Sequence, residues 1–253
     1  MLDYCRQHRP DLLVLGHADM IAPATVTEIR NAVSAVRVLQ WNVDPVFEPA
    51  NVARIESKRG VVDATLVTTG IAALGSLRAG GHRVGFLPNP VDPSIERGEN
   101  HLKRDLPYDL LYACGHPTLP LRQVAGKDWR MDDFMAELLA ALPGIRPLLA
   151  GLRGRPRLFG AAYQQALESA ALGLNISRRA DWPLYTSDRL AQMIGNGMAV
   201  LTERASGYDT IFSDDEILFF SSVDELVGKI RDAVARPERR QEIAARGRDS
   251  YIR

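Results

Sequence analysis

The sequence has 253 residues, of which 46% are hydrophobic and 25% are charged, with 31 basic and 31 acidic side chains. This composition is typical of a folded protein with one large or two ordinary domains, and it argues against disorder. The balanced charge gives no overall field that would attract nucleic acid. The polar amino terminus and the lack of an apolar run of about 20 residues predict no signal peptide and no transmembrane segment.

The two cysteines, Cys5 and Cys114, lie far apart in the sequence and form no Cys-x-x-Cys pair. This usage suits a reducing compartment, so we expect a cytoplasmic protein. The five histidines show no spacing typical of a zinc site, and the sequence therefore predicts no metal centre.

Four apolar runs in the first half of the chain have the length of buried strands. They cover residues 12–16, 36–43, 64–68 and 84–87, and a helix capped at Thr25 or Thr27 is expected after the first of them. Because the runs are apolar on both faces and alternate with helix-length segments, we expect a parallel sheet covered on two sides. The chain opens inside a helix, without the strand and glycine-rich turn that normally begin such a domain, so its first strands are expected to be missing.

Prolines between residues 88 and 93, followed by a charged stretch, predict a break between two domains. We expect an N-terminal Rossmann-like domain over residues 1–92, a linker over 93–107 and a C-terminal Rossmann-like domain over 108–253. Two α/β domains of this kind predict a cleft that faces the carboxyl ends of both sheets.

The second half repeats the alternation of strands and helices. Strands are expected over residues 108–114, 146–150, 172–176, 198–201 and 216–220, and helices over 132–142, 161–170, 222–234 and 237–253. Asp132 is expected to cap the first of these helices, and Ser222 and Glu225 form a capping box for the third.

The stretch from Tyr185 to Glu203 has the pattern of a short helix, a glycine turn and a buried strand. Thr186, Ser187 and Asp188 are residue types that cap helices. A helix start presents backbone N–H groups and the positive end of its dipole, and Arg189 adds a guanidinium that suits a phosphate. We interpret this segment as an anion-binding site, and the alternative is an ordinary capped helix with an exposed arginine.

Several segments of the second half resemble the nucleotide-binding domain of GT-B glycosyltransferases, most closely the CgeB-like proteins of glycosyl transferases group 1. The segments cover residues 160–163, 170–177, 187–197, 215–220 and 224–226. The resemblance covers residues 108–253 well, and the first half is similar mainly through its strand pattern and residues 86–92. It implies a GT-B glycosyltransferase with two Rossmann-like domains.

In that family, a helix begins with an arginine and carries a glutamate three residues later, five before a glycine. Arg189 and Gly197 match this frame, but Gln192 occupies the place of the glutamate. The family's glutamate is understood to hold the nucleotide ribose hydroxyls. Gln192 keeps a carbonyl acceptor and loses the charge.

The resemblance implies transfer of a sugar from a UDP- or GDP-linked donor to a hydroxyl of a glycan, a lipid-linked acceptor or a protein. The leaving diphosphate would be neutralised by Arg189, by the helix start at Ser187 and Asp188, and by the glycine loop at Gly115. No Asp-x-Asp motif occurs in the chain, so neither a metal nor another cofactor is expected.

Sugar transfer also needs a general base, which we expect on the first domain. His17 and Asp19 directly follow the first predicted strand, and Asp44 follows the second. The alternative for His17 is a loop histidine that is packed or solvated, and Asp44 precedes Pro45 and could simply begin a turn.

Three other functions fit the same observations. A nucleotide-sugar epimerase would use the same fold with an acid and a base close to the sugar. A nucleotide-sugar-binding protein without turnover would agree with Gln192 and with the missing first strands. A two-domain module that binds a ligand unrelated to nucleotides is the fourth interpretation.

Overall fold

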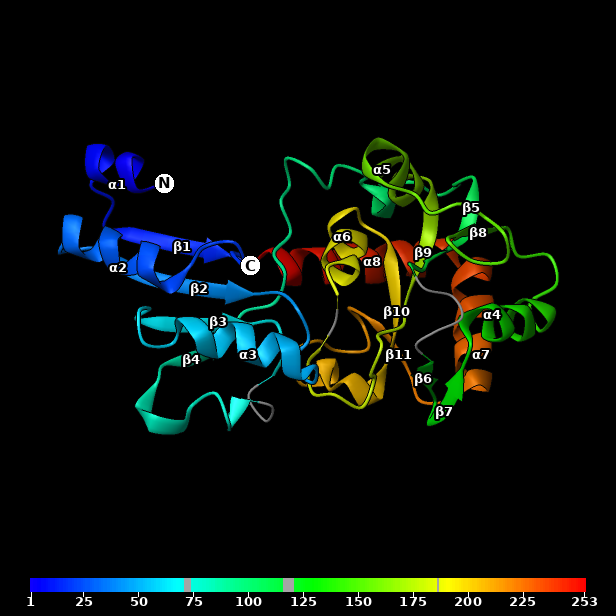
Figure 1. Ribbon diagram of the computed structural model, residues 1–253. Helices are drawn as coiled ribbons and strands as arrows, with labels where there is room; N and C mark the ends of the chain where they lie inside the picture. The colour runs from blue at the N-terminus through cyan, green and yellow to red at the C-terminus, as the bar shows by residue number, and fades with distance from the viewer. Residues whose placement is uncertain (71–73, 116–120, 186) are drawn as a thin grey trace. The chain divides into compact units, whose positions relative to one another are not determined.

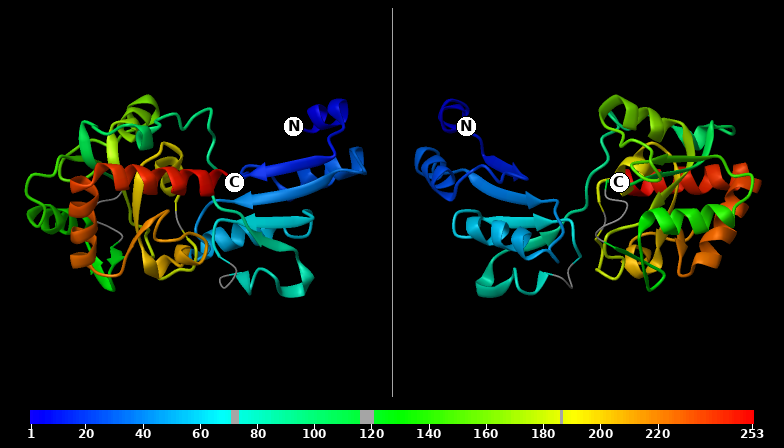
Figure 2. Two further views of the ribbon diagram at one scale, coloured as in Figure 1. Left: turned by 180° about the vertical axis from the view of Figure 1, so that it is seen from behind. Right: turned by 45° about the vertical axis from the view of Figure 1, so that its right-hand side comes forward.

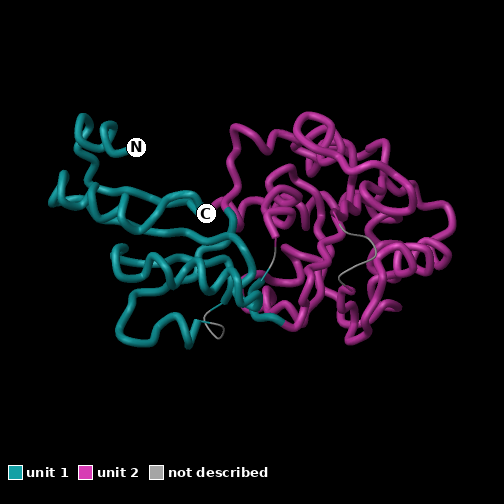
Figure 3. Tube along the Cα trace, viewed as in Figure 1, with its two compact units in different colours: residues 1–89, 182–185 teal, residues 90–181, 186–253 magenta. Residues whose placement is uncertain are grey.

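The computed structural model describes residues 1–70, 74–115, 121–185 and 187–253 (Figure 1). The chain divides into two compact units (Figure 3), residues 1–89 with 182–185 and residues 90–181 with 186–253. None of the helices in the described part of the chain combines the length and the apolar composition that crossing a bilayer requires.

The first unit is a four-stranded parallel sheet with helices. It contains α1 (Leu2–His8), β1 (Leu12–Gly16), α2 (Pro23–Ala32), β2 (Arg37–Asn42), α3 (Pro49–Lys58), β3 (Ala64–Val67), a 3₁₀ turn (Ala79–Gly81) and β4 (Val84–Phe86). The strands lie in the order β1-β2-β3-β4. The opening helix and all four expected strands are confirmed. The expected cap of α2 at Thr25 or Thr27 is wrong, because α2 begins at Pro23, whose fixed φ suits the first helical position.

The described helices cover only one face of this sheet. The sequence analysis predicted helices on both faces. Val26 of α2 packs with Leu15 and Val38, which are 3% and 1% exposed. Leu12 and Val14 alternate with Leu15 along β1 and therefore point to the opposite face, where they are 55% and 50% exposed. The view from behind shows the strands in front of α2 and α3 (Figure 2, left).

The second unit contains the larger parallel sheet. Its elements are β5 (Tyr108–Ala113), β6 (Arg122–Val124), β7 (Lys127–Trp129), α4 (Met131–Ala140), β8 (Pro147–Ala150), α5 (Gly160–Glu168), β9 (Ala170–Asn175), α6 (Arg189–Gly195), β10 (Ala199–Glu203), β11 (Leu218–Phe220), α7 (Val223–Ala235) and α8 (Pro237–Ile252), with 3₁₀ turns at Asn100–Leu102, Arg204–Ser206 and Tyr208–Thr210. The five expected strands are confirmed, and the β6–β7 hairpin was not predicted.

The strand order of this sheet identifies where a ligand is expected. The strands lie in the order β11-β10-β9-β5-β8, with all neighbours parallel. Counted from the first strand of the unit and read from the β8 edge, this is the doubly wound order 2-1-3-4-5, which changes direction between β5 and β9. Doubly wound sheets bind ligands outside the carboxyl ends of the strands at this switch point.

The segment 93–107, expected to be a linker, packs on the second unit. The side chain of Asn100 is 2% exposed, and its Nδ2 donates to the carbonyls of Leu167 and Ala170 at 2.7 and 2.9 Å. The N–H of Gly98 donates to Oδ1 of Asn196 at 2.8 Å. Polar residues of this segment therefore satisfy backbone groups of the second unit.

The two predicted helix caps of this unit have different outcomes. Ser222 is confirmed as the N-cap of α7, because its hydroxyl accepts the N–H of Glu225 at 3.1 Å. Asp132 does not cap α4, which begins after Arg130. Its carboxylate instead accepts the N–H of Arg153, in the next connection, at 2.6 Å.

Candidate functional site

Arg189, the first residue of α6, lies at the switch point of the second sheet. Its guanidinium donates to the carbonyl of Ala113, the last residue of β5, at 2.5 Å and to the carbonyl of Ile176, directly after β9, at 2.9 Å. Its Nε donates to the hydroxyl of Ser187 at 3.0 Å. These bonds use three of the five N–H groups of the guanidinium, whose central carbon lies 5.9 Å from the ring centre of the buried Tyr112. Arg189 therefore joins the two strand ends and keeps its positive charge at the switch point.

The start of α6 differs from the expected capped helix. Asp188 stands at the N-cap position, but its side chain makes no capping hydrogen bond. Its carboxylate accepts instead from Nε2 of Gln192 at 3.2 Å, on the exposed side of the helix. Helix α6 begins and ends where it was predicted, while the role assigned to the cap side chains is wrong for Asp188. Thr186 lies outside the described residues.

Two polar atoms close to Arg189 are buried and unpaired. Neither Oε1 of Gln192 nor the hydroxyl of Tyr163, on α5, has a hydrogen-bond partner in the described ranges. Burial raises the pKa of Tyr163 to about 12, against the opposing charge of Arg189. A buried polar atom without a partner costs about 1–3 kcal/mol. These atoms are therefore candidates for binding the hydroxyl groups of a ligand.

The two predicted glycines lie in different places. Gly115 follows β5 at the same strand end that Arg189 binds, and a side chain there would meet open space. Gly197 lies at the opposite end of α6 with a φ of +76°, and a Cβ at this position would come within 2.3 Å of Nδ1 of His101. Gly115 thus lies two residues beyond Ala113, whose carbonyl Arg189 binds, whereas Gly197 lies at the other end of α6 and has a packing role.

Glu203 is a buried carboxylate at the end of β10 that the sequence analysis did not single out. It is 6% exposed, and its Oε1 accepts the N–H of Ala125, in the β6–β7 turn, at 3.0 Å. Its Oε2 is buried and has no partner among the residues that the structure describes. Burial raises the pKa of Glu203, and the bond from Ala125 partly opposes this shift. The only feature of the sequence that could have indicated Glu203 is its position as an acidic residue at the end of an apolar strand.

The shifted pKa of Glu203 predicts a pH-dependent stability. Because the folded pKa is raised above the unfolded value, the contribution to stability is present at low pH and is lost as the pH rises through the folded pKa. We expect Glu203→Gln to raise the Tm relative to wild type at about pH 8, with a smaller difference at about pH 4. Thermal unfolding at both pH values measures this, with the exposed Glu137→Gln as control. The same pH-dependent difference in the control would contradict the assignment.

In the first unit, the structure brings together the three residues predicted as general-base candidates. Strands β1 and β2 are parallel neighbours, so their carboxyl ends meet at one edge of the sheet. The Nε2 of His17 lies 3.8 Å from Oδ2 of Asp19 and 3.8 Å from Oδ2 of Asp44. His17 has a φ of +47°, in the left-handed region.

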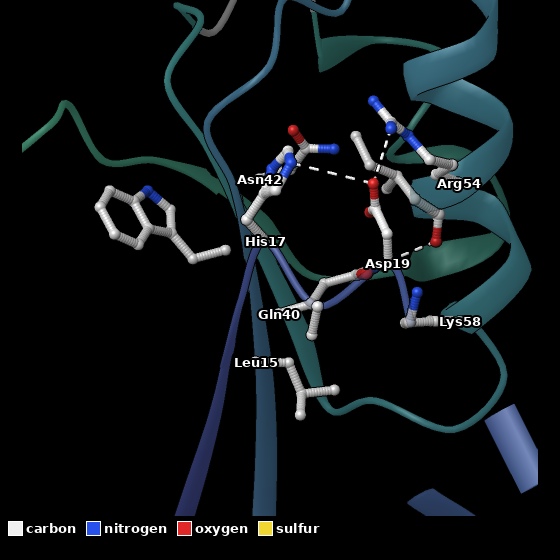
Figure 4. Close-up of a pocket in the computed structure, with 10 residues that line it drawn as sticks. Leu15, His17, Asp19, Gln40, Asn42, Arg54 and Lys58 are labelled. Atoms are coloured by element: carbon white, nitrogen blue, oxygen red, sulfur yellow. Dashed lines mark hydrogen bonds and ion pairs between the residues drawn. The ribbon is translucent and has the colours of Figure 1, made fainter. Parts of the chain in front are cut away.

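Arg54, on α3, holds both carboxylates and was not predicted. Its guanidinium bonds to Asp19 at 2.6 Å (Figure 4). It also bonds to Asp44 at 2.5 Å and donates to Oδ1 of Asn51. A hollow next to these groups is lined by His17, Asp19 and Arg54 together with Gln40, Asn42 and Lys58. An imidazole beside two fixed carboxylates can accept a proton, because the carboxylates stabilise the resulting imidazolium.

Comparison with known proteins identifies the family to which this chain belongs. Residues 122–253 match the model of a family described as glycosyl transferase-like. This chain belongs to the glycosyl transferase-like family. The matched region takes in slightly more than half of the 253 residues and contains α6 with Arg189 and Gln192. No curated protein of similar sequence was found.

Solved structures show the fold of this glycosyl transferase-like chain. HepE of Anabaena, in a crystal structure with UDP, aligns with a TM-score of 0.60 and 12% identity over 98% of this chain and 75% of that one. HepE with UDP-glucose gives a TM-score of 0.58 at the same identity. The N-terminal domain of Candida albicans trehalose-6-phosphate phosphatase gives 0.52 and 11% over 98% of this chain and 70% of that one. The fold class is GT-B, with two Rossmann-like domains.

Proposed function

We propose that this chain transfers a sugar from a nucleotide-diphosphate donor to an acceptor hydroxyl. The observation that carries the proposal is the position of Arg189 and Gln192 at the switch point of a doubly wound sheet, inside the region that matches the glycosyl transferase-like family. The HepE crystal structures contain UDP and UDP-glucose, which supports a UDP-linked sugar as the first donor to test.

In this proposal, the second unit binds the donor. The guanidinium of Arg189 and the backbone beside Gly115 would bind the diphosphate, where charge develops as the sugar leaves. The unpaired Oε1 of Gln192 would accept a ribose hydroxyl, and the unpaired hydroxyl of Tyr163 would bind a further polar group of the donor. Each bond to a charged group contributes about 1.5–3 kcal/mol.

The first unit would supply the general base. His17 would take the proton of the acceptor hydroxyl, and Asp19 and Asp44, held by Arg54, would stabilise the protonated imidazole. General-base catalysis of this kind accelerates a reaction by about 10²–10⁴-fold.

We further infer that the transfer needs no metal ion, because Arg189 provides the positive charge that a leaving diphosphate requires. Within the described ranges, no three His, Cys, Asp or Glu side chains are placed to hold a metal. Two buried free thiols, Cys5 and Cys114, suit a reducing compartment, so we place the reaction in the cytoplasm. The segments around Arg189 favour the CgeB-like branch of the family.

The decisive experiment combines thermal shift with an assay of sugar transfer. UDP, GDP, ADP and their sugar conjugates should be screened, because a ligand that binds only the folded state raises the Tm. We expect UDP or GDP to raise the Tm. We also expect a mixture of acceptors to accelerate consumption of the sugar donor, and this rate should be the same with and without EDTA. Loss of activity in EDTA that only added metal restores would contradict metal independence.

Gln192 provides the matched variant. Removing its carbonyl acceptor with Gln192→Ala should weaken nucleotide binding about tenfold, which corresponds to about 1.4 kcal/mol. The control is Gln123→Ala, a partly buried glutamine of the β6–β7 hairpin. Calorimetric titration with the nucleotide selected by the screen measures both, and equal affinities for Gln192→Ala and wild type would remove Gln192 from the site.

Gln192 also favours one alternative function. A protein with a glutamine at the position of the family's glutamate could bind a nucleotide sugar without transferring the sugar. A nucleotide-dependent rise in Tm without donor consumption, in any acceptor mixture, would support this alternative over the transferase.

A further inference from the structure

The connection between β8 and α5 carries a concentrated positive charge. Arg153, Arg155 and Arg157 are all exposed, and residues 151–159 contain no acidic side chain. None of these three guanidinium groups has a hydrogen bond or ion pair in the described part of the chain. Several other exposed arginines of the second unit are paired, for example Arg146 with Asp109 and Arg179 with Asp181. This segment therefore presents three uncompensated charges on a protein of zero net charge.

The backbone of this connection has a defined conformation. The N–H of Gly151 donates to the carbonyl of Pro156 at 2.9 Å, and the N–H of Arg155 donates to the carbonyl of Leu152 at 3.0 Å. Leu152 is 1% exposed and anchors the connection in the core of the second unit. Asp132 of α4 accepts the N–H of Arg153 at 2.6 Å. The charged side chains are thus held outward by a folded-back loop, so little backbone entropy is lost when a partner binds.

Apolar surface lies beside these charges. A hollow on the outer edge of the sheet, between α4 and β8, is lined by Leu139, Pro147 and Leu149 and bordered by Arg153 and Arg155. The connection ends at Phe159, whose exposed fraction of 73% is among the largest of the hydrophobic residues described. Phe159 follows Arg155 by four residues in an irregular segment and can lie no farther than about 14 Å from it along the chain.

We propose that this surface, Arg153–Phe159 with the hollow between α4 and β8, binds an anionic phospholipid membrane. A bilayer surface presents phosphate groups directly above an apolar layer, which complements guanidinium groups next to an exposed phenylalanine and aliphatic walls. Arginine suits this partner because its planar group binds phosphate oxygens in pairs. A soluble polyanion would match the charges and leave Phe159 and the hollow in water.

The location of the surface fits this proposal. Residues 151–159 follow β8, which is the edge strand of the second sheet, so no further strand of the described chain covers that side (Figure 1). Binding there depends on the three arginines and not on Arg189, Gln192 or His17. The variants of the test below therefore change the arginines and leave Arg189, Gln192 and His17 in place, and nucleotide binding is measured separately.

The test is co-sedimentation of the whole chain with vesicles. One set of vesicles contains phosphatidylcholine only, and in the other about a third of the lipid is phosphatidylglycerol. We expect binding to the anionic vesicles that weakens when the salt rises from about 0.1 M to about 0.5 M. The variant Arg153→Gln/Arg155→Gln/Arg157→Gln should lower the bound-to-free ratio at least tenfold, and Phe159→Ser should lower it severalfold.

A matched control removes the same charge elsewhere. Arg236→Gln/Arg239→Gln/Arg246→Gln changes three exposed arginines of α8 and its preceding residue, and it should keep vesicle binding. All variants should keep the wild-type far-UV circular dichroism and the wild-type change of Tm with UDP. The proposal is overturned if wild type does not bind anionic vesicles, or if the control loses binding equally. It is also overturned if the loop variant keeps vesicle binding.

Discussion

Replacing His17 by asparagine should lower the rate of sugar transfer by about 10²–10⁴-fold and leave the affinity for the donor nucleotide unchanged. His17 lies 3.8 Å from each of two carboxylates, which Arg54 holds in place. Removal of the imidazole takes away the proposed proton acceptor, while the groups around Arg189 that we propose for donor binding belong to the other unit. Initial rates under saturating donor, together with nucleotide titration, measure the two quantities separately.

Asparagine is the appropriate replacement because of the backbone. His17 has a φ of +47°, which asparagine tolerates far better than most other residues, so His17→Asn changes the side chain with little added strain. His8→Asn, at an exposed position of α1, is the matched control and should keep full activity. A His17→Asn enzyme with the wild-type rate would exclude His17 as the base and direct attention to Asp19 and Asp44.

The sequence was sufficient for the elements whose signal is local. The apolar runs that became β5 and β9 were recognised because a strand buried on both faces has a continuous hydrophobic sequence. The helix α6 and its glycine turn were placed correctly from the spacing of Leu190, Met193 and Ile194. The sequence also placed His17 and Asp44 after successive strands, and the pairing of these strands brings the two side chains within 3.8 Å of each other.

Other features depend on contacts between distant residues, which carry no local signal. Arg54 is an ordinary arginine on an amphipathic helix until folding places Asp19, 35 residues away, against it. The sequence assigned Asn100 to a charged linker, although its side-chain amide donates hydrogen bonds to two carbonyls about 70 residues later in the chain. The β6–β7 hairpin was missed because its three-residue strands are too short for a period-two pattern.

The same reason explains the most important correction at the donor site. From the sequence, Arg189 was a phosphate ligand or an exposed surface residue, and neither description is complete. Two carbonyls at the ends of β5 and β9 accept from its guanidinium, so the residue is part of the framework of the switch point. Only the strand order, which joins β5 to β9, reveals this role.

Arg189→Ala is therefore expected to have two separable effects. The loss of its hydrogen bonds leaves the carbonyl of Ala113 without this donor, while Ile176 keeps its bond from Arg122 at 2.9 Å. The free energy of unfolding should fall by about 1–3 kcal/mol, and the Tm by about 2–4 °C for each kcal/mol. Nucleotide affinity, measured by calorimetry below the Tm of both proteins, should fall at least tenfold, or about 1.4 kcal/mol.

Arg189→Lys distinguishes the framework role from the electrostatic role. Lysine keeps the positive charge, but a single ammonium group cannot reproduce the planar geometry that joins two carbonyls and still presents N–H groups to a phosphate. We expect its Tm to fall nearly as far as that of Arg189→Ala, with an intermediate loss of affinity. Arg179→Ala, which removes an exposed arginine paired with Asp181, should change stability by no more than about 1 kcal/mol. If Arg189→Ala lowers the Tm and leaves nucleotide affinity intact, Arg189 serves the fold alone and the diphosphate binds elsewhere.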